Sequence, residues 1–275
     1  MHRLITICFS HYVERARWGL DLTELDYREE PHMPVFHSPF VWSVHRGRAG
    51  RRDAASSPLS TPVLVTPENE LICDSRAILA YLDQPERLRG RAPLYPVDHP
   101  EAERLDALEQ RWHDKLATHS RRLAYGACFS SPVVLREIAE RNVGGTEARV
   151  FRLATPLIER FMVRYLRIDD AALERSRERC WRELDAAAEV LQDGRPYLGG
   201  ARFSGWDLSF ACFAAPLVLP PEYGAWIPGP SELDEDTRAY IEEVREHPAA
   251  QHALRMFAEH RPRSGLTRAR AAPSP

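Results

Sequence analysis

The stretch TPVLVTPENELICDSRAILAYL, residues 61–82, contains two short apolar runs followed by a helical pattern. Thr61–Val65 and Glu70–Cys73 are separated by a polar turn that contains proline and asparagine, which predicts an antiparallel hairpin. Asp74 and Ser75 follow, and both residue types can accept hydrogen bonds from the free N–H groups of a helix's first turn. The stretch therefore predicts a strand–strand–helix unit.

The residues before this unit predict a strand, a helix and a second strand. Leu4–Phe9 is a nearly continuous apolar run, typical of a strand buried on both faces of an α/β sheet. Apolar residues recur at helical spacing over Tyr12–Leu22, and Asp26–Pro31 is a candidate strand. Residues 32–60 form a long irregular connection with room for one short helix. The predicted order is β-α-β-β-β-α, an α/β domain with a mixed sheet.

The rest of the chain has a helical pattern. Four prolines and three arginines between Gln84 and Pro100 are typical of a linker. We therefore expect a domain over 1–84, a linker over 85–100, an all-helical domain over 101–261 and a disordered tail over 262–275. Three apolar stripes at helical spacing are interpreted as core: Leu105, Leu108, Trp112 and Leu116; Leu153, Leu157, Phe161 and Tyr165; and Trp181, Leu184, Ala188 and Leu191.

Two further helices are marked by specific signals. Ser204 and Asp207 have the spacing of a capping box, and the helix that follows is apolar nearly all round, so we expect it to be buried. A last helix is predicted over 235–260, with a break at Pro248.

Composition excludes several classes of function. The net charge of −3 gives no basic excess for nucleic-acid binding, and no apolar run is long enough to cross a membrane. The five cysteines are scattered and never spaced C-x-x-C, which argues against a disulfide framework or a zinc site. We expect reduced, mostly buried thiols, a cytoplasmic protein without a signal peptide, no metal, and no nucleic-acid or membrane partner.

Four motifs resemble those of the glutathione transferase superfamily, in the family's order. The strand running into Ser10-His11-Tyr12-Val13 is similar to its active-site turn, and Thr61-Pro62-Val63-Leu64 resembles its "VPxL", whose proline is cis. Asp74-Ser75-Arg76-Ala77-Ile78 resembles "E/D-S-xx-I", and residues 197–207 resemble a motif of the helical domain. The resemblance implies a thioredoxin-like N-terminal domain, a helical substrate-binding domain, a homodimer and glutathione as co-substrate, with another low-molecular-weight thiol as the alternative.

The resemblance also implies roles for particular residues. The reactive form of a thiol is the thiolate, which the partial positive charge at a helix N-terminus and a hydroxyl donated by Ser10 would stabilise. The backbone of Thr61, turned outward by a cis bond to Pro62, would pair with the backbone of the bound peptide. Asp74 and Ser75 would take the ammonium and carboxylate of a γ-glutamyl group, since a helix start favours anions.

Each of these assignments has an alternative. Ser10 can be a plain N-cap, and Tyr12 is either a rival catalytic residue or a packing residue at the domain boundary. His11 is either a base or substrate contact or, as we expect, a partly exposed solvated residue. Arg46, with Arg48, Arg51 and Arg52, is either a ligand for the glycine carboxylate of glutathione or a solvated arginine of the connection.

The sequence departs from the family at three points. Val13 stands at the position of a second cysteine, which excludes dithiol exchange, and Ser10 replaces a nucleophilic cysteine, which argues against deglutathionylation. The connection over 32–60 is longer than usual and lacks "NPxG". The contacts to the glycine end of glutathione, and the identity of the thiol itself, stay open.

Three functions remain under consideration. The first is a transferase that activates a small thiol for attack on an electrophilic, mostly apolar substrate, by conjugation or thiol-assisted isomerisation, with the substrate against the helices that carry Trp112, Tyr125 and Phe129. The second is a non-catalytic binding or carrier protein, since a fold does not fix a function. The third is a hydrolase or dehalogenase of the same fold.

Overall fold

The computed structural model describes residues 1–46, 50, 58–88 and 90–262. Its sheet has the strand order β2-β1-β3-β4, formed by β1 (His2–Ile7), β2 (Tyr27–His32), β3 (Val63–Val65) and β4 (Leu71–Cys73). β1 and β2 are parallel, whereas β3 is antiparallel to β1 and to β4. The predicted mixed sheet, the β-α-β unit and the hairpin are therefore confirmed, with boundaries that differ by one or two residues.

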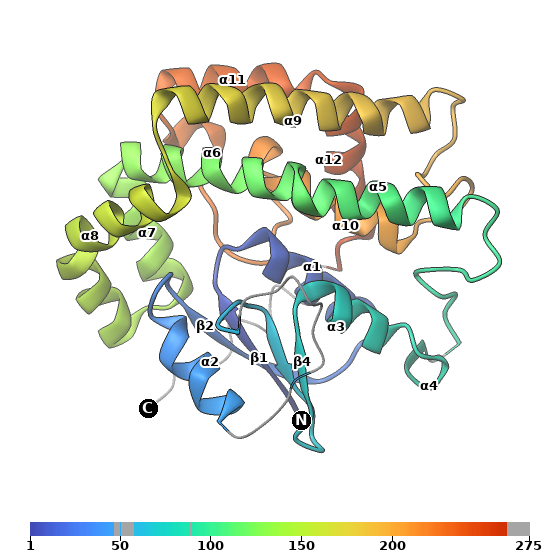
Figure 1. Ribbon diagram of the computed structural model, residues 1–275, viewed down its shortest axis with the longest axis horizontal. Helices are drawn as coiled ribbons and strands as arrows, with labels where there is room; N and C mark the ends of the chain where they lie inside the picture. The colour runs from blue at the N-terminus through green and yellow to red at the C-terminus, as the bar shows by residue number, and fades with distance from the viewer. Residues whose placement is uncertain (47–49, 51–57, 89, 263–275) are drawn as a thin grey trace.

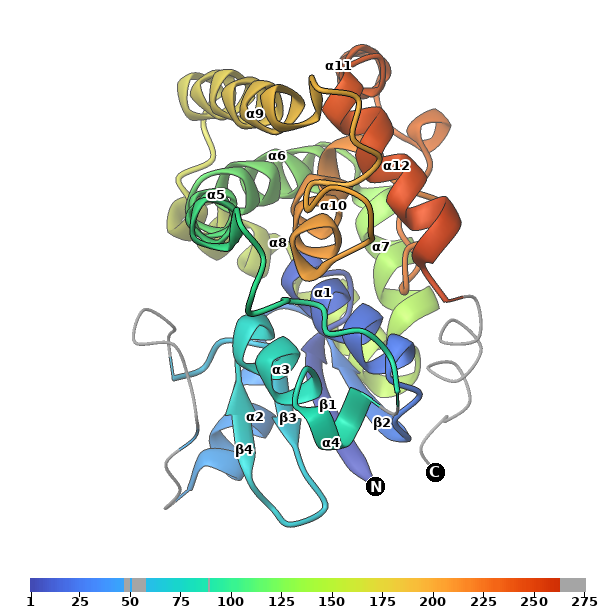
Figure 2. The ribbon, with the colours of Figure 1, turned by 90° about the vertical axis from the view of Figure 1, so that its right-hand side faces the viewer.

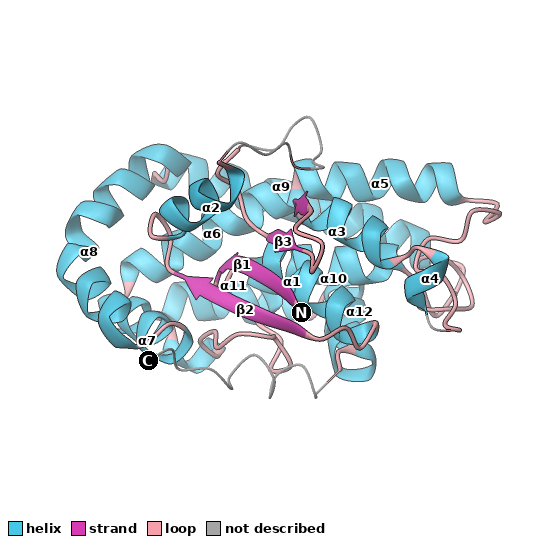
Figure 3. Ribbon diagram, turned by 90° about the horizontal axis from the view of Figure 1, so that it is seen from below, coloured by secondary structure: helices cyan, strands magenta, loops and turns pink. Residues whose placement is uncertain are grey.

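Helices cover both faces of this sheet (Figures 2 and 3). Successive side chains of a strand point to opposite faces. Leu4, Leu64 and Ile72 accordingly belong to the core formed with α1 (His11–Leu22) and α3 (Ser75–Leu82). Their neighbours Ile5 and Val63 pack against α2 (His37–His45), a short helix within the long connection, as the sequence allows. The sheet is thus the middle layer of a three-layer unit.

A layer of helices stacks above α1 and α3 (Figure 1). After the short α4 (Pro85–Leu88) come α5 (Ala102–Asp114), α6 (Leu116–Ser130), α7 (Pro132–Asn142), α8 (Gly145–Leu166), α9 (Asp170–Leu191), α10 (Gly205–Val218), a 3₁₀ turn (Pro230–Glu232), α11 (Glu235–Arg245) and α12 (Pro248–His260). α4 lies in the stretch that the sequence predicts to be a linker. Residues 263–275, most of the expected tail, lie outside the described residues.

The buried helix and its capping box are confirmed. α10 packs against α1 on one side and α12 on the other, and nearly all of its residues are buried. The Asp207 carboxylate accepts hydrogen bonds from the backbone N–H of Ser204 at 3.0 Å and of Leu198 at 2.7 Å. The predicted break of the last helix also occurs, because α12 begins at Pro248.

One predicted core stripe is wrong. Leu153, Leu157, Phe161 and Tyr165 on α8 are 80%, 74%, 54% and 68% exposed. The buried face of α8 is instead formed by Ala148, Phe151, Ile158, Met162 and Leu166. α8 carries two apolar stripes at helical spacing, and only one of them can face α7 and the interior.

The first predicted stripe is divided between two helices. α5 ends at Asp114 and α6 begins at Leu116, with Lys115 between them. Trp112 and Leu116 are nevertheless fully buried, so the stripe is core as predicted. All five cysteines are buried free thiols, which also agrees with the sequence analysis.

Candidate thiol site and adjoining cavity

Ser10 occupies the N-cap position of α1, at the point where β1 has ended. Its backbone is extended, with φ −71° and ψ 129°, and its carbonyl accepts the first helical bond from Glu14 at 2.9 Å. Ser10 is therefore the N-cap residue by position, but its side chain makes no capping hydrogen bond. The first N–H groups of α1 have no partner within the helix, which leaves donors and a partial positive charge for an anion.

The Thr61–Pro62 peptide bond is cis, as the motif predicts. The Pro62 carbonyl accepts a hydrogen bond from the Asp74 N–H at 3.0 Å, so the turn before β3 is joined to the start of α3. Within the part of the chain that is described, the backbone of Thr61 makes no hydrogen bond. Its N–H and C=O groups are therefore available to a ligand backbone.

Asp74 is the N-cap of α3. Its carboxylate accepts a hydrogen bond from the Ala77 N–H at 2.8 Å, and its φ is 75°, an uncommon value for a residue other than glycine. The next residue, Ser75, is only 2% exposed. The hydrogen bond from Asp74 to Pro62 therefore joins the start of α3 to the Thr61–Pro62 turn. The cavity into which Ser10 opens is not lined by Pro62, Asp74 or Ser75.

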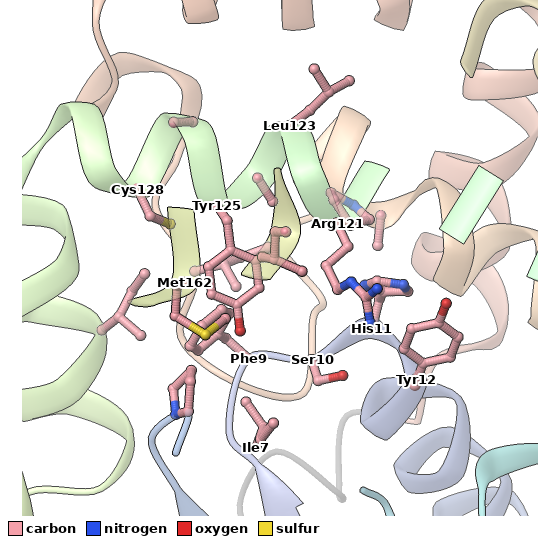
Figure 4. Close-up of a pocket in the computed structure, with 18 of the residues that line it drawn as sticks. Ile7, Phe9, Ser10, His11, Tyr12, Arg121, Leu123, Tyr125, Cys128 and Met162 are labelled. Atoms are coloured by element: carbon pink, nitrogen blue, oxygen red, sulfur yellow. The ribbon is translucent and has the colours of Figure 1, made fainter. Parts of the chain in front are cut away.

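That cavity has a volume of about 460 Å³ and lies between the sheet unit and the helical layer. Figure 4 shows Ser10 at its floor, with Tyr125 and Arg121 reaching in from α6. Ser10, His11, Tyr12 and Thr61 all line it, whereas the rest of the wall is mostly apolar. A mostly apolar pocket of this size with a few polar groups is typical of small-molecule sites.

His11 is buried, so its expected solvent exposure is wrong. It is 3% exposed, and burial followed by the charge of Arg121 lowers the pKa of its imidazole to about 3. The ring bonds the backbone of Ala117 on α6, and its Nε2 atom is buried without a hydrogen-bond partner. The burial comes from α6, a helix distant in sequence, and no local pattern around His11 indicates it.

Tyr12 packs where the sheet unit meets the helical layer. Its ring lies 4.3 Å from that of His11 and 5.7 Å from that of Phe213 on α10, measured between centroids. Its hydroxyl is 3.5 Å from the His113 carbonyl, and burial raises its pKa. These contacts agree with the packing alternative for Tyr12, although its side chain also lines the cavity.

Other predicted residues lie away from the cavity. Arg46 is exposed at the end of α2, with its guanidinium carbon 5.0 Å from the centroid of the Trp42 ring, and Arg48, Arg51 and Arg52 lie outside the described residues. Of the residues expected along the substrate, Tyr125 lines the cavity, whereas Trp112 is fully buried against Phe210. Phe129 packs on Tyr125 and does not line the cavity.

Arg121 is the lining residue that the sequence analysis missed. It stands on α6 next to Arg122, but only Arg121 lines the cavity. In an arginine-rich chain, nothing in the local sequence distinguishes these two positions, because the rotation of α6 decides which one faces inward. Arg121 could have been proposed from the sequence only if the helix that contains it had been assumed to form a wall of the site.

The described residues contain no group of three or more His, Cys, Asp or Glu side chains placed to hold a metal ion. No helix among them is long and apolar enough to pass through a bilayer.

The fold and the site together define a class: a thioredoxin-like unit whose first helix opens into a cavity shared with a helical layer. Compared with known families, residues 4–90 match the model of the glutathione S-transferase N-terminal domain. By sequence, no curated protein matches the chain.

Solved structures match over nearly the whole length. The chain is 16% identical to a glutathione transferase from Burkholderia graminis, solved with two glutathione molecules bound per subunit, with a TM-score of 0.58 and coverage of 98% of this chain and 89% of that one. It is 18% identical to a glutathione S-transferase from Methylobacillus flagellatus with glutathione bound, with a TM-score of 0.53 and coverage of 97% and 98%. A glutathione S-transferase from Xanthobacter autotrophicus is 15% identical, with a TM-score of 0.55 and coverage of 94% and 93%.

Residues 4–90 thus match the glutathione S-transferase N-terminal domain, and the whole chain has a fold similar to that of solved glutathione S-transferases.

Proposed function

We propose that the protein is a glutathione transferase that activates the sulfur of glutathione at the N-terminus of α1. The observation that carries the proposal is the Ser10 hydroxyl, which makes no capping bond and lines a cavity beside the unbonded first turn of α1. A hydroxyl and helix N–H groups directed at one point favour an anion there, and the thiolate is the nucleophilic form of a thiol.

The glutathione backbone would lie along the Thr61–Pro62 turn. Thr61 lines the same cavity as Ser10, and its backbone groups make no hydrogen bond to other described residues. The γ-glutamyl end would extend toward Asp74 and Ser75, which the Pro62 carbonyl joins to this turn. The glutathione bound in the two matched structures supports this choice of thiol.

The electrophile would occupy the adjoining cavity. Its wall includes Phe9, Tyr125 and Met162, which suit an apolar substrate, and the thiolate would attack an electrophilic carbon held next to Ser10. Positioning both reactants in one cavity and stabilising the thiolate would supply most of the rate enhancement. Conjugation and thiol-assisted isomerisation both use this arrangement.

Conjugation of glutathione with 1-chloro-2,4-dinitrobenzene tests the proposal. Removing one hydrogen bond to an anion costs about 1.5–3 kcal/mol, so Ser10→Ala should lower kcat/KM by roughly tenfold to a hundredfold. The matched control is Ser38→Ala, which removes a hydroxyl from the α2 wall of the same cavity. Equal activity of Ser10→Ala and the unaltered protein would contradict the role of Ser10.

Two further measurements, combined with this assay, decide between an enzyme, a carrier and a dehalogenase. Retention on immobilised glutathione without turnover of any electrophile would favour the non-catalytic binding protein, and release of chloride without a conjugate would favour the dehalogenase.

We further propose a cytoplasmic homodimer, with domains over 1–84 and 101–261. Sedimentation equilibrium measures the oligomeric state.

A further inference from the structure

The cavity wall carries one permanent positive charge, on Arg121 of α6. No other Arg or Lys and no Asp or Glu is among the described residues that line the cavity. Arg121 forms no ion pair within the described part of the chain, and its Nε atom is buried without a hydrogen-bond partner. Buried polar groups in native proteins are normally hydrogen-bonded, so this guanidinium lacks the anion that would satisfy it.

The guanidinium carbon of Arg121 lies 6.0 Å from the centroid of the Tyr12 ring, but no described acidic side chain of the cavity wall compensates its charge. Figure 4 shows the guanidinium next to the ring of His11, which is neutral at pH 7 because its pKa is lowered to about 3. Burial also lowers the pKa of His37, which lines the cavity from α2. The neighbouring Arg122 has its own pKa lowered, first by burial and then by Arg121 and Arg175, which indicates an excess of positive charge here.

A second unsatisfied atom lies in the same corner. His11 Nε2 is buried and without a partner, although His11 is 3% exposed. Orphaned polar atoms on two neighbouring side chains indicate that a polar group of a ligand belongs at this place, between α1 and α6. The rest of the wall, which includes Phe9, Tyr125 and Met162, offers an apolar surface to the body of the same ligand.

We propose that the electrophile taken by this cavity carries a carboxylate, which pairs with the guanidinium of Arg121 while the carbon under attack faces Ser10. Arg binds carboxylates through two parallel hydrogen bonds, and in an apolar cavity such a pair is stronger than in water. The inference rests on the proposed function for its chemistry and names the substrate class of that function.

Glutathione also contains carboxylates, but its expected position is different. Its γ-glutamyl end is assigned to Asp74 and Ser75, which do not line the cavity, and its backbone to Thr61. Arg121 belongs to α6, in the helical layer that supplies the wall for the second substrate. We assign the carboxylate that it binds to the electrophile, and the experiment includes an arm for the glycine carboxylate of glutathione.

The test compares two electrophiles that differ in one charge: 4-chloro-3,5-dinitrobenzoate and 4-chloro-3,5-dinitrobenzamide. In both, the glutathione sulfur forms a bond to the ring carbon, the carbon–chlorine bond breaks, chloride leaves with the electron pair, and the thiol proton goes to solvent. Each kcat/KM is divided by the uncatalysed rate constant of the same electrophile. We expect the carboxylate to be preferred by roughly tenfold or more, and Arg121→Gln to abolish this preference.

Two variants make the comparison specific. Arg121→Lys keeps the charge without the paired donors and should retain part of the preference. Lys115→Gln removes an exposed cation at the start of α6 that does not line the cavity, and it should leave the preference unchanged. An equal preference in Arg121→Gln and the unaltered protein would overturn the proposal.

Binding separates this inference from the proposed function. Calorimetric titration with unreactive 4-methyl-3,5-dinitrobenzoate and its amide measures the same preference without turnover. If the amide is conjugated but the carboxylate has no advantage in rate or affinity, the inference fails and the transferase remains. If neither electrophile reacts, the transferase fails, and an Arg121-dependent affinity for the carboxylate still supports the subsite. If Arg121→Gln weakens glutathione alone by the same factor, Arg121 serves the thiol and the inference is overturned.

Discussion

Ser10 and His11 are adjacent in the sequence, but only the position of Ser10 at the cavity can be predicted from the local sequence, whereas the burial of His11 cannot. The cavity position of Ser10 follows from its place at the end of β1 and the start of α1, which the local motif indicates. The burial of His11 depends on α6, whose Ala117 backbone bonds the ring. Local patterns predict which residue begins a helix, but they do not contain the packing partner that later covers it. Arg121 was missed for the same reason.

The buried imidazole of His11 predicts a pH dependence of stability. Its pKa is about 3 in the folded protein and near 6.5 in the unfolded chain, so the unfolded chain binds more protons between these values. Stability therefore falls as the pH drops below 6.5. From pH 7 to pH 5, His11 should account for about 2 kcal/mol of the loss in unfolding free energy.

Urea unfolding of the unaltered protein and of His11→Asn at both pH values measures this contribution. The variant should lose less stability on acidification, whatever its stability at pH 7, because it has no imidazole to protonate. Equal losses in the two proteins would contradict a neutral, buried His11.

At the scale of elements, the sequence predicts the order of strands and helices well, but not which face of a helix is buried. The hairpin of β3 and β4 follows from two apolar runs around a polar turn, and α10 follows from its capping box. α8 carries two apolar stripes, and its sequence does not indicate which of them packs against α7. The prediction failed at α8 because periodicity identifies a face without naming its partner.

A matched pair of substitutions tests the orientation of α8. Leu157 and Ile158 are adjacent, but Leu157 is 74% exposed and Ile158 only 8%. Leu157→Glu should change the unfolding free energy by less than about 0.5 kcal/mol, as expected of an exposed site. Ile158→Glu would bury an unpaired charge and should destabilise by about 3 kcal/mol or more.

Chemical denaturation followed by circular dichroism measures both values. Similar losses for the two variants, or a larger loss for Leu157→Glu, would mean that the exposed stripe is covered, for instance by a second copy of the chain. Sedimentation of Leu157→Glu would then show whether the proposed homodimer forms through this stripe.

At the scale of the whole molecule, a buried ionic network joins the end of α12 to the sheet unit. Arg261 pairs with Glu14 and with Asp21 of α1, each at 2.6 Å, and Arg17 pairs with Glu29 of β2 at 2.6 Å. Glu14 also accepts a hydrogen bond from Arg17 at 3.2 Å. The network therefore holds α1, whose N-terminus is the candidate thiol site, between β2 and the residue that follows α12.

Removal of Arg261 should loosen this connection. Both partners are at most 9% exposed, and breaking a buried ion pair leaves uncompensated charge, which typically costs 3–5 kcal/mol. Arg261→Ala should destabilise by about 3 kcal/mol or more in thermal or chemical unfolding. The control Arg238→Ala removes an exposed partner of Glu242 and should cost less than about 1 kcal/mol. Equal small effects would contradict the structural role of the network.

The central claim is that the N-terminus of α1, with the Ser10 hydroxyl, stabilises a thiolate. The most direct test is the pKa of the glutathione thiol bound to the protein, followed by the ultraviolet absorbance of the thiolate as the pH is raised. A free thiol has a pKa near 8.5, and we predict a bound value at least about one unit lower that rises toward the free value in Ser10→Ala. A bound thiol that titrates like free glutathione, or one unaffected by Ser10→Ala, would contradict the account.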